Sequence, residues 1–297
     1  MPPFVRHAAR LALFLALGFL EQNALAEEDA AATDGGLALP RAHRMAEEAL
    51  RGLLLLLPVP TQHRLRGTYL AFDGASLDVN ALAACDDDGD HVVVLTDSLL
   101  LLLDFVAQAS ASDTRSPAHK LLDYGAFIGA SQRAGKRFLP PAPGFFERDE
   151  RGDGTATRPT PGGLEAERFE EALTGLVAHE LAHILDGDVA CRAPTSTREQ
   201  GDDVWTPAEQ AQAIANARLT YTADSALEAH RMATKLLRGI DASGPRQHGE
   251  PPKGDGYLDF LTFVDAAERA RPTISPIVYL TFHPHPAAWR QGESTIR

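Results

Sequence analysis

The spacing of apolar positions along the chain predicts a mainly helical protein. Between residues 169 and 184, apolar side chains recur three or four positions apart, which predicts a helix over 163–186. Further helices are predicted at 41–57, where Pro58 and Pro60 stop the helix, and at 97–109, 207–240 and 257–270. The region around 111–163, whose second half is dense in Pro and Gly, is predicted to be a surface insertion.

Three short stretches have the composition of β-strands. They cover residues 66–72, 77–85 and 91–96, and all of them precede the second predicted helix. The acidic turn Asp86-Asp87-Asp88-Gly89-Asp90 separates the last two stretches, which predicts a hairpin. The expected fold class is therefore α+β, mainly helical, with a small hairpin or sheet.

The first 26 residues have the features of a secretory signal peptide. Two arginines precede an apolar run over 11–20, and Ala24-Leu25-Ala26 forms an A-x-A cleavage site. Ten apolar residues are fewer than the roughly 20 that a membrane-spanning helix needs, so we expect cleavage after Ala26. The mature chain would then lie in the periplasm or outside the cell, without a transmembrane segment. It would consist of a linker over 27–40 and one domain over 41–297.

The net charge argues against one class of partner. The chain carries 28 Lys and Arg against 41 Asp and Glu, a formal charge of −13. Because nucleic acid is itself strongly negative, we expect no nucleic-acid binding. Two leucine runs, 53–57 and 99–103, are too short to span a membrane and are expected to be buried in helices.

The chain has two cysteines, Cys85 and Cys191. An oxidising compartment would permit them to pair, so a disulfide is predicted for an exported chain. Closing a loop of about 100 residues could stabilise the fold by up to about 4.7 kcal/mol. Two separate buried thiols are the alternative.

The predicted helix over 163–186 contains the motif His179-Glu180-Leu181-Ala182-His183. Residues four apart lie on one face of a helix, about 6 Å from each other, so both histidines can bind one metal ion. Glu180 lies one step around the helix, where its carboxylate can reach a metal-bound water as a general base. Zinc lowers the pKa of such a water from about 15.7 towards 7. The motif therefore predicts zinc-dependent hydrolysis of peptide bonds.

With this motif the sequence resembles the gluzincin metallopeptidases of the HtpX, CaaX prenyl endopeptidase and BepA type. The resemblance rests on residues 80–83 with 92–100, on 176–184, on Glu228-Ala229-His230-Arg231-Met232-Ala233 and on His283-Pro284. It implies a minigluzincin-like domain whose hairpin lies beside the metal and binds a polypeptide substrate as an added strand. It also implies that His283 stabilises the oxyanion, and that the substrates and associated proteins belong to the cell envelope.

The motif supplies two zinc ligands, whereas catalytic zinc sites have three protein ligands and one open position. The resemblance places the third on the helix after Pro207, where the candidates are Asp224, Glu228 and His230. On a continuous helix His230 is turned about 160° from Glu228. The two side chains therefore lie on nearly opposite faces, and only one of them can reach the metal. Glu228 is predicted as the ligand, because it matches the family's ligand type, and Asp224 as a carboxylate that orients a ligating histidine.

Two other functions are left open by the sequence. Thr220 or Ala226 stands at the offset where the family carries its ligand Glu, so the chain could be an inactive pseudopeptidase that binds polypeptides as an adaptor or holdase. Retention of Glu180 favours the enzyme, because a binding module has no need of a general base. The other alternative is a structural zinc site completed by Cys191, although structural sites normally close all four positions with Cys or His.

Overall fold

The computed structural model describes residues 37–75, 79–86, 89–115, 119–133, 141, 145–146, 163–189, 191, 223–241 and 255–270. Its helices are α2 (Leu39–Leu56), α3 (Val59–Arg64), α4 (Asp97–Arg115), α5 (Lys120–Arg133), α6 (Leu164–Asp186), α8 (Ala223–Asp241) and α9 (Asp255–Ala270), and its strands are β1 (Tyr69–Asp73), β2 (Ala81–Cys85) and β3 (His91–Thr96). This confirms the α+β, mainly helical class with one small sheet. The predicted signal peptide, residues 207–222 of a predicted helix and the segment with His283 lie outside the described residues.

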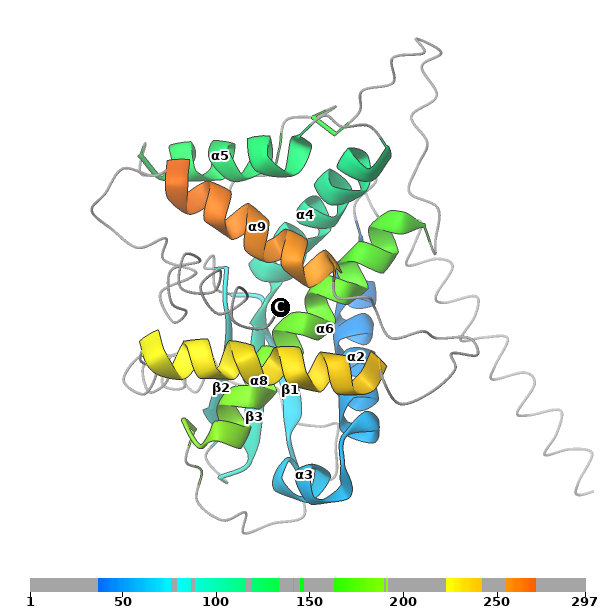
Figure 1. The fold of residues 1–297 in the computed structure, drawn as a ribbon, viewed down its shortest axis with the longest axis vertical. Coiled ribbons are helices and arrows are strands. Elements are labelled where there is room, and N and C mark those ends of the chain that lie inside the picture. Colours follow the sequence, from blue (N-terminus) through cyan, green and yellow to red (C-terminus); the bar gives the residue numbers. More distant parts are fainter. Residues whose placement is uncertain are drawn as a thin grey trace, which may run out of the picture.

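The three strands form one sheet in the order β1-β3-β2 (Figure 1). β2 and β3 are antiparallel, with Ala83 opposite Val93, which confirms the predicted hairpin. Its turn contains Gly89 at φ 86°, a left-handed conformation that glycine adopts without steric cost. β1 pairs with the other side of β3 in parallel, a pairing that the sequence did not predict. β3 is therefore the central strand and β2 lies at one edge.

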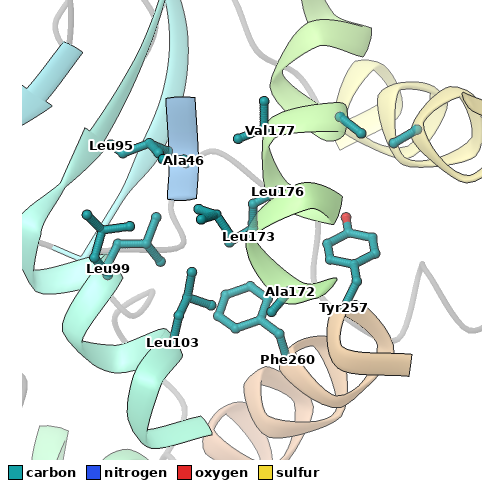
Figure 2. Close-up of a cluster of buried hydrophobic side chains, with 14 of the residues drawn as sticks. Ala46, Leu95, Leu99, Leu103, Ala172, Leu173, Leu176, Val177, Tyr257 and Phe260 are labelled. Atoms are coloured by element: carbon teal, nitrogen blue, oxygen red, sulfur yellow. The ribbon is translucent and has the colours of Figure 1, made fainter. Parts of the chain in front are cut away.

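Helix α6 is the centre of the helical part of the fold, with α2, α4, α8 and α9 packed around it. Every residue over 171–185 is buried, including the polar residues at 171, 174, 179, 180 and 183. Figure 2 shows the inner face, where Leu173 and Leu176 face Leu103 of α4 and Phe260 of α9. The segment that carries the histidine motif is thus held rigidly by its neighbours.

Helix α5 falls inside the range 111–163 that was predicted as an insertion, but it belongs to the core. Its Tyr124 and Ile128 are fully buried. Two glycines of α5 allow it to pack directly on α9, since a Cβ at Gly129 would lie 2.1 Å from the carbonyl oxygen of Ala267. The Pro- and Gly-rich composition behind the prediction begins only near Ser131, at the end of this helix.

The two leucine runs differ from each other. In the run 99–103, every leucine except Leu101 is buried, as expected. In the run 53–57, Leu53 and Leu57 are buried, but the two leucines at 55 and 56 are exposed, so the prediction of a buried run is wrong for them. Leu53 is on the buried face of α2, whereas Leu55 and Leu56 lie in its last turn on the side away from the core. None of the described helices is long and apolar enough to cross a membrane.

Candidate active site

The histidine motif lies in the buried second half of α6. His179 is 1% exposed, and Glu180 and His183 are fully buried. The Nε2 atoms of the two imidazole rings point toward each other and lie 3.2 Å apart. Two Nε2 ligands of a tetrahedral zinc ion, each about 2.1 Å from the metal, would be about 3.4 Å apart. The structure therefore brings the two predicted ligands together at a spacing that fits one zinc ion.

Asp188 orients the ring of His183. The Nδ1 atom of His183 lies 2.8 Å from Oδ2 of Asp188. Because a carboxylate can only accept, Nδ1 carries the proton and the lone pair of Nε2 points to His179. Burial lowers the pKa of His183 to about 4, which keeps the ring in its neutral, metal-binding form.

The end of α6 explains how Asp188 reaches this position. Gly187 ends the helix at φ 87°, in the left-handed region. The resulting turn brings the backbone N–H of Asp188 to the carbonyl oxygen of His183, at 3.1 Å. Asp188 was not among the site residues predicted from the sequence. The available signal was a glycine directly after the apolar period, which predicts that the next residue folds back on the last turn.

Glu180 lies between α6 and the edge strand of the sheet. The backbone of Ala83 on β2 interacts with its carboxylate and favours the ionised form. Burial raises the pKa of Glu180 to about 8, and the interaction with Ala83 partly opposes this shift. A cation held beside the carboxylate would favour its ionised form, in which it can act as a base.

A tyrosine from α9 belongs to the same buried region. The ring of Tyr257 packs on Gly175 of α6, where a Cβ would come within 2.3 Å of the ring. The neighbouring Gly256 N–H donates to the buried carboxylate of Glu171 at 2.7 Å, which fixes the start of α9 on α6. Burial raises the pKa of Tyr257, and the charge of Glu180 raises it further, so the hydroxyl keeps its proton. The sequence offered no signal for this residue.

The candidates for a third ligand on α8 lie on different faces. The Glu228 carboxylate is 3.2 Å from Arg231, and its side chain is 42% exposed. His230 is buried, with Nδ1 3.4 Å from the Tyr257 hydroxyl, and burial together with the charge of Arg231 lowers its pKa to about 4. The side chain of Asp224 lies outside the described part. Within the described ranges, no third His, Cys, Asp or Glu forms a metal-holding group with the α6 pair, so Glu228 as a ligand stays a prediction.

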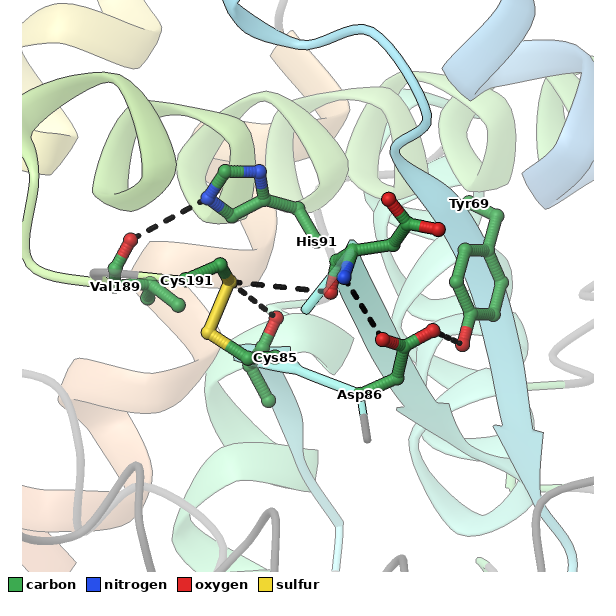
Figure 3. The surroundings of a disulfide bond; sticks show 8 residues. Tyr69, Cys85, Asp86, His91, Val189 and Cys191 are labelled. Atoms are coloured by element: carbon green, nitrogen blue, oxygen red, sulfur yellow. Dashed lines mark hydrogen bonds between the residues drawn. A yellow bond between two sulfur atoms is a disulfide. The ribbon is translucent and has the colours of Figure 1, made fainter. Parts of the chain in front are cut away.

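A disulfide joins the end of β2 to the segment after α6 (Figure 3). It links Cys85 to Cys191 across 106 positions of sequence, which confirms the predicted pair. The alternative of a structural zinc site completed by Cys191 is thereby excluded for the oxidised protein, because the thiolate is not available. The crosslink also holds the edge strand close to the segment that carries Asp188.

Comparisons with protein-family models, with curated proteins and with solved structures found no match. The function of the site is therefore inferred from its own geometry and chemistry.

Proposed function

We propose that this chain is a zinc-dependent endopeptidase of the minigluzincin type. One observation carries the proposal: the Nε2 atoms of His179 and His183 face each other at 3.2 Å, with the fully buried Glu180 on the same helix. The two histidines would hold zinc, which when bound supplies a Lewis acid for the peptide carbonyl and lowers the pKa of a water. The hydrogen bond from Asp188 would fix the ring of His183 for this purpose.

The edge strand supports a polypeptide as the substrate. Among the described strands β2 pairs only with β3, and its residue Ala83 interacts with Glu180. A peptide added along this edge would place a carbonyl group beside the base. Glu180 would then accept a proton from the attacking water. Exported or misfolded envelope proteins are the proposed substrates.

The oxyanion needs a hydrogen-bond donor, and Tyr257 is a candidate within the described residues. Its hydroxyl stays protonated, because burial and the charge of Glu180 raise the pKa of Tyr257. The resemblance gives this role to His283, which lies outside the described residues. Both groups can be tested by substitution, since loss of an oxyanion donor typically lowers kcat by about 10²- to 10³-fold.

In place of the prediction of Glu228 made from the sequence, we propose that zinc binding depends on His230. His230 is buried and contacts Tyr257, whereas the carboxylate of Glu228 is half-exposed and paired with Arg231. His230→Ala should lower the zinc affinity by at least about tenfold, and Glu228→Ala on the same helix should leave it unchanged. Competition with a chromophoric chelator measures both affinities. A loss of zinc affinity confined to Glu228→Ala would support Glu228 as the third ligand, as predicted from the sequence.

Casein degradation by the purified protein tests the proposed function. Degradation should stop when a chelator is added and return with added zinc. A Glu180→Gln protein purified in the same way controls for contaminating peptidases. Degradation that a chelator does not affect would contradict a metal mechanism, and absence of degradation by a zinc-loaded protein would favour the adaptor alternative.

A further inference from the structure

The three most exposed large apolar side chains among the described residues lie together where α2 passes into α3. They are Leu55, Leu56 and Val59, which are 72%, 51% and 61% exposed; we call them the apolar tip. Gln62 of α3 donates to the carbonyl oxygens of Leu55 and Leu57, at 3.3 and 2.9 Å, so the turn is held in one conformation. An exposed apolar group in a fixed turn is typical of an interaction surface.

The segment that carries the tip is basic although the protein is acidic. Residues 49–72 contain Arg51, His63, Arg64 and Arg66 but no Asp or Glu, in a chain with a formal charge of −13. All four of these side chains belong to exposed residues. Arg64 also donates to the Leu185 carbonyl at the end of α6. No carboxylate of the described residues forms an ion pair with Arg51 or Arg66, so both charges are available to a partner.

The tip also projects from the body of the molecule. α3 lies at the lower end of the described fold, beyond the ends of α2 and β1 (Figure 1). We propose that the apolar tip inserts into the surface of an anionic lipid bilayer, with the surrounding arginines on the phosphate groups. Exposed apolar side chains inside a basic rim are the combination that binds membrane interfaces. The three side chains would leave water, and the basic segment 49–72 would be attracted to anionic lipid. This inference does not depend on the proposed peptidase activity.

Fluorescence from a tryptophan placed at the tip tests the proposal. In the full chain, Leu56→Trp is compared with the parent protein and with Leu122→Trp, a control at a partly exposed leucine on α5. With phosphatidylcholine vesicles that contain phosphatidylglycerol, the Leu56→Trp signal should shift to the blue and be quenched by brominated acyl chains. The Leu122→Trp signal should neither shift to the blue nor be quenched. This readout is specific to the position, so attachment through the apolar run at 11–20 would not imitate it.

Two further measurements test which chemical groups bind the tip to the bilayer. Adding Arg51→Gln and Arg66→Gln to the Leu56→Trp protein should weaken quenching in the phosphatidylglycerol vesicles, by about fivefold in apparent affinity for each arginine. Vesicles of phosphatidylcholine alone should give little quenching. Equal quenching at positions 56 and 122, or an unshifted signal at position 56 with every vesicle, would overturn the proposal. The second result would favour an acidic protein as the partner of the tip.

Discussion

Glu180→Gln is expected to lower casein degradation by about 10²- to 10⁴-fold while the protein still binds zinc. The substitution keeps the shape of the side chain, and the amide oxygen can still interact with the backbone of Ala83. The amide cannot take up a proton from water, so the chemical step should fail. The metal should stay because His179 and His183 are unchanged.

Rates of casein degradation and the zinc content of the same preparations check this expectation. Glu167→Gln is the matched control, because it makes the same change at an exposed position on the same helix. Unchanged cleavage by Glu180→Gln would refute the role of base. Loss of zinc from that variant would show instead that the carboxylate binds the metal.

The largest effect on stability is expected at the contact between α5 and α9. A Cβ at Gly129 would lie 2.1 Å from the carbonyl oxygen of Ala267 and 2.9 Å from the Cβ of Ala270. The nearest atom is backbone, so the two helices would have to separate. Gly129→Ala should therefore lower the free energy of unfolding by about 3 kcal/mol, at the upper end of overpacking effects.

Gly52 on α2 offers a control for this prediction, because a Cβ there would meet nothing within 4 Å. Gly52→Ala should raise the free energy of unfolding by about 0.5 to 1 kcal/mol, through helix propensity and a less flexible unfolded chain. Denaturant titration compares the two variants. If both shift the midpoint in the same direction and by the same amount, the close packing of α5 on α9 is not what stabilises this region.

Local patterns predicted the parts of the fold that depend on local sequence. The apolar period around residues 169–184 predicted α6 to within a residue, and the acidic turn predicted the hairpin of β2 and β3. The approach of His179 to His183 was predicted from their spacing alone, since positions four apart share a helix face. The parallel pairing of β1 with β3 has no local signal, because β2 separates the two strands along the chain.

The rest of the candidate site is assembled from distant segments, which a single sequence does not reveal. Tyr257 reaches α6 because Gly175 leaves room for its ring, and neither residue is unusual within its own helix. Glu228 matched a family motif, but its face of α8 carries an exposed ion pair, whereas the buried face carries His230. The choice between the two faces depends on the packing of α8 against α6.

Zinc content of the purified chain shows whether helix α6 binds a metal ion. After dialysis against trace zinc, the wild-type protein should retain one ion per chain. The protein with His179→Ala and His183→Ala should retain none, while circular dichroism shows that it keeps its helical content. A wild-type protein that retains no zinc, or a double variant that retains as much as the wild type, would contradict the assignment of α6 as a metal-binding catalytic helix.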